Sequence, residues 1–152
     1  MTETRRPTLS TAIAYRDPLA ALKWLEQAFG FESTIVVMNP DGTLGHSEMR
    51  LGDGMIMVGS EWDERHRSPA SIGGMNTQSI HVQLTDGIDA HCERARAAGA
   101  VITREPADQF YGDRVYGALD PEGHVWSFGQ TFSAMSLDEM AKQGGVSVRE
   151  RL

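Results

Sequence analysis

Alternate positions in one short segment carry side chains that could do acid–base or metal chemistry. His46, Glu48 and Arg50 are spaced two residues apart, and side chains with that spacing on a β-strand lie on the same face. An imidazole and a carboxylate on one face could remove a proton or help to bind a divalent ion. The same two groups could instead hydrogen-bond to each other, to Arg50 or to water, which is the ordinary structural role of such residues.

A repeated pattern predicts the elements that position these side chains. Residues 17–30 and residues 86–99 each begin with aspartate and end with glycine. Aspartate can cap the N-terminus of a helix, and glycine can adopt the left-handed conformation that ends one, so both segments are predicted to be helices. Apolar residues recur in each segment at helical spacing, which indicates one buried face.

Strand patterns flank both predicted helices. Apolar residues alternate with small or polar residues in 9–15 and in 80–85, immediately before the helices, and further strand-like segments follow each helix. Turn sequences rich in Pro, Asp and Gly separate these later segments. Each half is therefore predicted to be β-α-β-β-β, which gives an α+β fold of two tandem modules at 8–60 and 78–130.

The composition argues against several classes of protein. The chain has 152 residues, of which 40% are hydrophobic, and a net charge of −7, so it can bury a substantial core but is poorly suited to nucleic acid. No apolar run approaches the roughly 20 residues that cross a bilayer, so no membrane partner is expected, and the N-terminus lacks the apolar stretch of a signal peptide. Cys92 is the single cysteine and cannot form an internal disulfide. A reducing, cytoplasmic location is therefore expected.

Three segments lie outside the repeat. Residues 1–7 are predicted to be a flexible arm. Residues 61–77 are polar and rich in Gly, Pro and Ser, and they form either a plain linker or a flap over a pocket. The tail, residues 131–152, contains the capping-box sequence from Ser136 to Glu139, which predicts a short helix that ends at the following Gly-Gly pair.

The duplicated pattern resembles the vicinal oxygen chelate superfamily, the group of glyoxalase I, bleomycin- and fosfomycin-resistance proteins and extradiol dioxygenases. The similarity covers about residues 8–130, and its most specific motif is Asp-Pro-Glu-Gly-His-Val-Trp-Ser-Phe at 120–128. Residues 100–130, which include Tyr-Gly-Asp-Arg at 111–114, are most similar to the small bacterial glyoxalase-like branch. The resemblance implies a glyoxalase/bleomycin resistance fold, in which a curved mixed sheet forms a cup with helices on its convex face. It also implies a homodimer.

The resemblance further implies where a metal would be held. Metal-dependent members place one ligand on the first and the last strand of each module, usually His, Gln or Glu. In this chain those positions carry Ser10, Met57, Ser127 and either His81 or Ile80, depending on a one-residue shift in the turn at 85–87. Hydroxyl and thioether groups are poor ligands for such an ion, so no cofactor is expected at this position.

The same fold implies which side chains face the interior of the cup. Trp126 and Phe128 are assigned to the core. The predicted ligand-binding residues are His46, Glu48, Arg50, Met57, His81, Gln83, Arg114 and Tyr116. Methionine adapts to an irregular apolar ligand, and the two arginines could pair with a carboxylate or phosphonate. We therefore expect a metal-free protein that binds a small, partly acidic, antibiotic- or metabolite-like molecule.

Other interpretations of these residues stay open. In one, a lyase or isomerase of the glyoxalase type uses Glu48 or His81 as its general base. These two residues and His46 could also hold a displaced zinc, nickel or manganese ion. In another, the chain is a binding or assembly module without a small ligand. Arg114 and Tyr116 could equally be an ordinary ion-pair partner and a surface hydroxyl.

Overall fold

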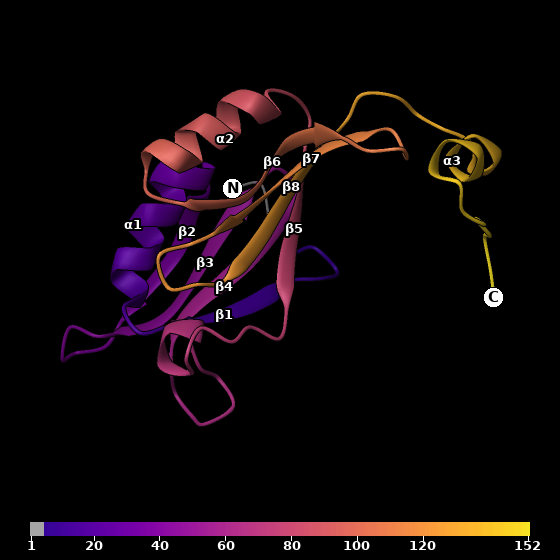
Figure 1. The fold of residues 1–152 in the computed structure, drawn as a ribbon. Coiled ribbons are helices and arrows are strands. Elements are labelled where there is room, and N and C mark those ends of the chain that lie inside the picture. Colours follow the sequence, from indigo (N-terminus) through magenta and orange to yellow (C-terminus); the bar gives the residue numbers. More distant parts are fainter. Residues whose placement is uncertain (1–4) are drawn as a thin grey trace.

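The computed structural model describes residues 5–152 and contains the predicted pair of β-α-β-β-β modules (Figure 1). The first module consists of β1 (Thr11–Tyr15), α1 (Pro18–Phe29), β2 (Glu32–Met38), β3 (Leu44–Leu51) and β4 (Gly54–Ser60). The second consists of β5 (Ser79–Leu84), α2 (Ile88–Ala97), β6 (Val101–Asp108), β7 (Asp113–Leu119) and β8 (Val125–Thr131). A single 3₁₀ turn, η1 (Pro69–Ser71), lies between the modules, and α3 (Leu137–Gly144) follows them. The predicted α+β class and tandem repeat are confirmed.

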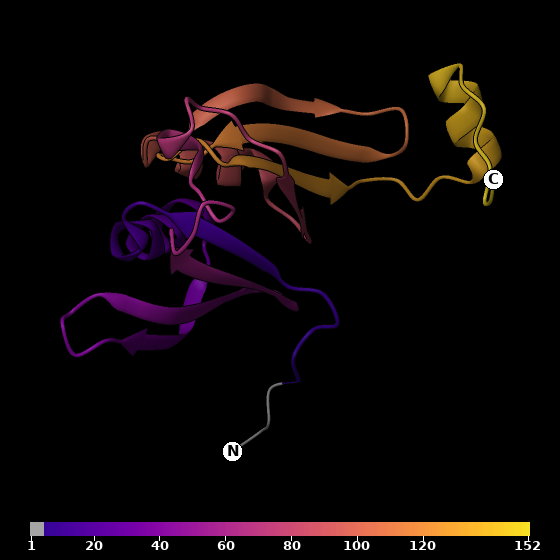
Figure 2. The ribbon, with the colours of Figure 1, turned by 90° about the horizontal axis from the view of Figure 1, so that it is seen from below.

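The strands form two four-stranded mixed sheets, which lie in separate layers (Figure 2). Their orders are β1-β4-β3-β2 and β5-β8-β7-β6, so the two sheets have the same topology. In each sheet the first and last strands of the module pair in parallel, and the other pairs are antiparallel. The helices α1 and α2 lie side by side (Figure 1), and each packs on its own sheet.

The two helices begin differently, although their sequences suggest the same signal. The Asp17 carboxylate accepts a hydrogen bond from the Ala20 amide at 3.0 Å, as predicted for an N-cap. The prediction that Asp86 caps the second helix is wrong, because Gly87 occupies the N-cap position and makes no side-chain bond. The amide of Ile88 donates instead to the side-chain oxygen of Gln130 on β8, at 3.0 Å.

One hydrophobic core joins both modules. Trp126 and Phe128 on β8 are fully buried, as predicted, and both rings contact Phe29 from the end of α1. Phe31, immediately after α1, also packs against Trp126, with ring centroids 5.7 Å apart. Because first-module rings fill the second module's core, neither module buries its apolar face independently.

The turn between β7 and β8 attaches to the first module through a buried carboxylate. Asp120 accepts hydrogen bonds from the Tyr15 hydroxyl at 2.7 Å and from the Trp126 indole N–H at 3.1 Å. Burial and the neighbouring Asp120 charge raise the pKa of Tyr15 well above its ordinary value, so the phenol stays protonated and donates. His124 also reaches this module, since its Nε2 lies 2.8 Å from the Ala14 carbonyl oxygen.

Glu122, in the same turn, binds both the start of α1 and the linker. Its carboxylate accepts hydrogen bonds from the backbone amides of Arg16 and Asp17, at 2.6 and 3.0 Å. It also accepts one from the hydroxyl of Ser68, at 2.6 Å. The fully buried Ser68 therefore fixes the linker to a turn of the second module.

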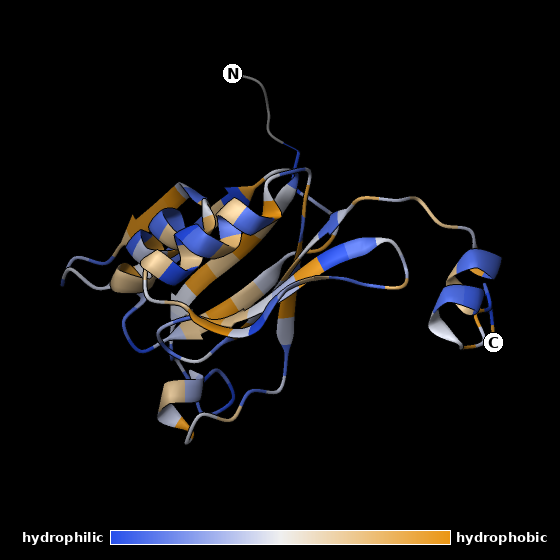
Figure 3. Cartoon of the chain, turned by 45° about the horizontal axis from the view of Figure 1, so that its top comes forward, coloured by the Kyte–Doolittle hydropathy of each residue, from blue (hydrophilic) through white to orange (hydrophobic). Residues whose placement is uncertain are grey.

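The tail after β8 leaves the body of the protein. Its start is attached at Gly112, whose carbonyl accepts the amides of Phe132 and Ser133 at 2.9 and 3.2 Å. The predicted capping box at the start of α3 is present, with reciprocal bonds between Ser136 and Glu139. Figure 3 shows α3 apart from both sheets. None of the described helices is both long and apolar enough to cross a membrane.

A partly buried histidine lies between the two helices and β7. The Nε2 of His91 lies 2.8 Å from the Phe29 carbonyl oxygen, and this nitrogen must donate. Its Nδ1 then accepts from the Tyr116 hydroxyl, at 2.6 Å. Burial lowers the pKa of His91 by more than the Phe29 carbonyl raises it, with a further lowering from Arg94.

This arrangement predicts a pH dependence of stability. Because the folded pKa of His91 lies below the unfolded value of about 6.5, the unfolded state binds more protons as pH falls through this range. The free energy of unfolding should therefore fall between about pH 7 and pH 5.5 more steeply for the wild type than for His91→Gln. Urea unfolding at several pH values measures the difference, in which the contributions of unaltered carboxylates cancel. Parallel curves for the two proteins would contradict this.

Candidate functional site

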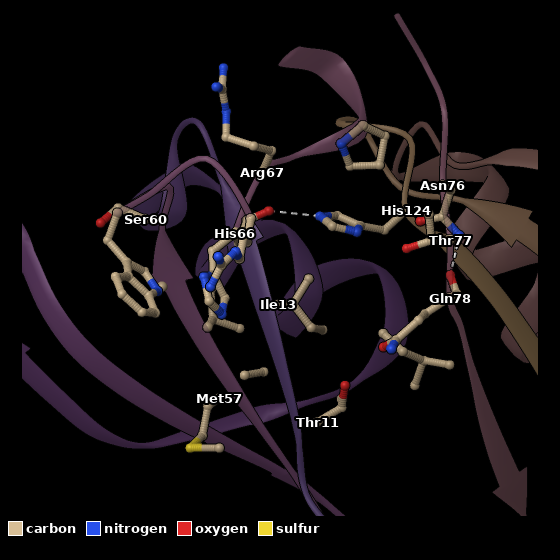
Figure 4. Close-up of a pocket in the computed structure, with 18 of the residues that line it drawn as sticks. Thr11, Ile13, Met57, Ser60, His66, Arg67, Asn76, Thr77, Gln78 and His124 are labelled. Atoms are coloured by element: carbon tan, nitrogen blue, oxygen red, sulfur yellow. Dashed lines mark hydrogen bonds between the residues drawn. The ribbon is translucent and has the colours of Figure 1, made fainter. Parts of the chain in front are cut away.

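A cavity of about 560 Å³ lies between the first sheet and the linker, and we call it the linker cavity. Figure 4 shows His66 and Arg67 on one side of it and Thr77 and Gln78 on the other, with Thr11 and Met57 from the sheet in the lower part of the view. The volume is within the range that holds a small organic ligand. The lining comes from β1, β3 and β4 and from the linker. It is completed by Ile80 near the start of β5, by Val125 at the start of β8, and by Gln78 and His124, which immediately precede these two strands.

Only two of the predicted ligand-binding residues line the linker cavity, His46 and Met57. The strand register explains why they share a surface: Ala12 pairs with Met57, and Met57 pairs with Glu48, two residues from His46. Directly opposed residues of paired strands lie on the same face of a sheet. These residues therefore share one face of the first sheet, and His46 and Met57 reach the linker cavity from it.

Glu48 and Arg50 share that face but lie outside the linker cavity. The Glu48 side chain is only 6% exposed, and it pairs with Arg6 at 2.7 Å and with His46 at 3.3 Å. Burial alone would raise the pKa of Glu48, but hydrogen bonds from Arg6 and His46 hold it below its ordinary value. Arg6 thus attaches part of the predicted N-terminal arm to the sheet, whereas residues 1–4 of that arm lie outside the described residues.

His81 and Gln83 belong to a separate polar network on the second sheet. His81 lies 2.7 Å from the Ser127 hydroxyl through Nδ1 and 2.9 Å from the Gln83 oxygen through Nε2. Because an amide oxygen only accepts, Nε2 carries the proton and Nδ1 accepts from Ser127. Gln83 in turn donates to Asp113 and Thr131, at 3.1 and 3.0 Å. A side chain at Gly129 would collide with His81 and Gln83, so glycine leaves the space that this network fills.

The prediction that Arg114 and Tyr116 face the interior of the cup is wrong. Tyr116 is fully buried and stacks on Phe128 with ring centroids 4.9 Å apart, because the two residues are directly opposed on β7 and β8. Arg114 lies on the same side of β7 as Tyr116 and pairs with Asp89 at 2.8 Å and with Asp108 at 3.0 Å. Its guanidinium is thus held by two carboxylates outside the linker cavity.

The linker supplies the cavity residues that the strand pattern did not predict. Trp62, Arg65, His66, Arg67 and Met75 all line it. One indication of their role was present in the sequence, namely the predicted alternative that residues 61–77 form a flap over a pocket. Strand and helix periodicity could not identify them, because this segment has neither. Among the described residues, Arg67 pairs with Glu61 at 3.3 Å, whereas no carboxylate lies within ion-pair distance of Arg65.

The described side chains that line the linker cavity are basic or uncharged, although the chain is acidic. The described lining includes two arginines and three histidines, His46, His66 and His124, but no aspartate or glutamate. The chain as a whole has 21 acidic and 14 basic residues. His46, His66 and Arg67 pair with carboxylates beside the cavity, so among the described lining residues Arg65 is the group best placed to pair with an anionic ligand.

Comparison with known proteins agrees with the duplicated fold. Residues 9–128 match the family model of the Glyoxalase/Bleomycin resistance protein/Dioxygenase superfamily. The chain belongs to this superfamily. It is 33% identical over 146 residues to an uncharacterized protein of Mycobacterium bovis, a match that covers 91% of this chain and 95% of the relative.

Solved structures of the superfamily fold give the same result. The crystal structure of TioX from Micromonospora sp. ML1 is 34% identical, with a TM-score of 0.64, and the match covers 86% of this chain and all of that one. TnmS3 from Streptomyces sp. CB03234, an antibiotic binding protein, has a TM-score of 0.62 at 19% identity, covering 86% of this chain and 98% of that one. At this identity TnmS3 shows a shared fold alone.

The positions predicted to correspond to the superfamily's metal ligands do not fit a divalent ion. Ser10 is exposed before β1 and Met57 lies in the linker cavity, whereas His81 and Ser127 bond to each other. Hydroxyl and thioether groups are weak ligands for such an ion. The displaced set of His46, Glu48 and His81 is not assembled either, since no three His, Cys, Asp or Glu side chains of residues 5–152 are grouped for a metal.

Proposed function

We propose that this superfamily member binds a small, partly apolar molecule with an anionic end in the linker cavity, without the help of a metal. The ligand is of the antibiotic or metabolite type. In this proposal residues 8–130 act as one domain, and the linker at 61–77 closes over the first sheet. The observation that carries the proposal is Arg65, which lines the cavity and has no carboxylate within ion-pair distance among the described residues, while none of the described lining residues is acidic.

The remaining lining supports a ligand with an apolar part. Met57 and Met75 have flexible thioether side chains that adapt to irregular shapes. Ile13, Ile72 and Ile80 add apolar surface, and a few polar groups among them would fix the orientation of the ligand. The fold shared with the antibiotic binding protein TnmS3 supports a binding role.

A ligand screen with a matched pair of variants tests this proposal. A molecule that binds only the folded state raises the melting temperature, because stability increases by RT ln(1 + [L]/Kd). We expect at least one anionic member of an antibiotic and metabolite panel to do so. Arg65→Ala should weaken its binding about tenfold, which is roughly the 1.4 kcal/mol of one charge-assisted contact.

Arg104→Ala is the matched control, because Arg104 is an exposed arginine on β6 that does not line the cavity. It should leave the affinity unchanged. The proposal fails if no compound shifts the melting temperature, or if Arg65→Ala binds the active compound as tightly as the control does.

We also propose that the chain forms a homodimer through its tail. α3 stands apart from the sheets, and its apolar face, which includes Leu137 and Met140, buries no residue fully. The ring of Phe110, in the β6–β7 turn, lies against Gly144 and extends this apolar surface. An apolar helix face with so little cover favours contact with a second copy.

Size-exclusion chromatography tests the dimer. The full chain should elute as a dimer, and a chain that ends at residue 132 should elute as a monomer. The double variant Leu137→Ser/Met140→Ser should also be monomeric, and it keeps the whole chain in case truncation impairs folding. Identical elution of all three proteins would show that the tail does not hold a dimer.

A further inference from the structure

The indole of Trp62 is an exposed aromatic surface at the linker cavity. The residue is 70% exposed, although it is among the largest apolar side chains of the protein. One side of the ring system is occupied by His66, whose ring is nearly parallel at 22° and has its centroid 4.1 Å away. Because Trp62 lines the cavity and is mostly exposed, the other side of the indole is available to a ligand.

The turn that presents this indole is fixed before any ligand arrives. One carboxylate oxygen of Asp63 accepts from the amides of Arg65 and His66, at 2.8 and 2.9 Å, and from the His66 ring at 2.7 Å. The bond from His66 is the main cause that lowers the pKa of Asp63. His66 is therefore held in place beneath Trp62, and little conformational entropy is lost when a ligand stacks on the indole.

The base of this turn is fixed as well. The Ser68 amide donates to the carboxylate of Glu61 at 2.8 Å, and the Ser68 hydroxyl donates to Glu122 at 2.6 Å. The two ends of the segment from Glu61 to Ser68 are thus bonded to each other, and Ser68 is also bonded to the second module. Arg65 extends from the middle of this segment and lines the same cavity as Trp62.

We propose that the ligand carries a planar aromatic ring that stacks on the open face of Trp62, and an anionic substituent that pairs with Arg65. The inference rests on the proposed function and narrows its ligand class to aromatic acids. An indole face attracts a flat π-system through dispersion and quadrupole terms beyond simple area burial. A saturated ring of similar size presents no such face, so the site should discriminate between the two.

Two carboxylates of contrasting shape test the stacking. The probes are 2-naphthoate, which is planar, and trans-decalin-2-carboxylate, which has the same carbon skeleton and charge but is saturated and not planar. Calorimetry gives both affinities, and tryptophan fluorescence reports the contact. Trp126 is fully buried and Trp24 is partly buried, so quenching by naphthoate should come from Trp62.

The wild type should bind naphthoate about tenfold more tightly than the saturated acid. Trp62→Leu should remove this preference by weakening naphthoate alone, and Trp62→Phe should restore most of it. Equal affinities of the wild type for the two acids, or a preference that survives in Trp62→Leu, overturn the stacking and leave the anion site intact. If neither acid binds, the stacking proposal is wrong, and the wider panel with Arg65→Ala decides the proposed function separately.

Discussion

The carboxylates of Asp120 and Glu122 hold the two modules and the linker in one arrangement. Asp120 is buried and accepts from Tyr15 of the first module and Trp126 of the second, so that removing it would leave buried donors without partners. Glu122 accepts the free amides before α1 together with the hydroxyl of Ser68. A single turn therefore bonds to the end of β1, to the start of α1 and to the linker at Ser68.

The linker cavity follows from this attachment. Its floor is the face of the first sheet that carries Met57 and His46, and its other wall is the linker that Glu122 holds through Ser68. His124 contributes from the second module, with its ring against Tyr15 and its Nε2 at the Ala14 carbonyl. A site at this place needs both modules, although each module has a complete sheet of its own.

Local rules predicted most of the fold. The Asp17 cap, the glycines that end both helices and the alternation along β3 are decided by neighbouring residues, and the structure agrees with them. The start of α2 was missed because Gln130, distant in sequence, satisfies the Ile88 amide that Asp86 was expected to serve. The orientation of Tyr116 was missed for a related reason, since it depends on the pairing of β7 with Phe128 of β8.

The site was less predictable than the fold. The two arginines that line the linker cavity, Arg65 and Arg67, lie in a segment without periodicity, and its position depends on contacts with Glu122 and Asp63. Sequence spacing instead pointed to Arg114, whose charge is satisfied by Asp89 and Asp108. The spacing of residues along a strand determines which of them share a face of the sheet. It does not determine which face of the sheet the linker covers.

Amide hydrogen exchange in a Glu122→Ala variant tests most directly whether this turn holds the linker over the sheet. The amides of Ala70, Ser71, Ile72 and Gly74 bond to Ser68 or Pro69 within the linker, so they report its order. Their exchange should quicken about tenfold or more in Glu122→Ala, while the amides of β3 and β7 keep their rates. Asp53→Ala, which removes an exposed carboxylate from the corresponding turn of the first module, should change neither set. Unchanged exchange at these four amides in Glu122→Ala would contradict the account.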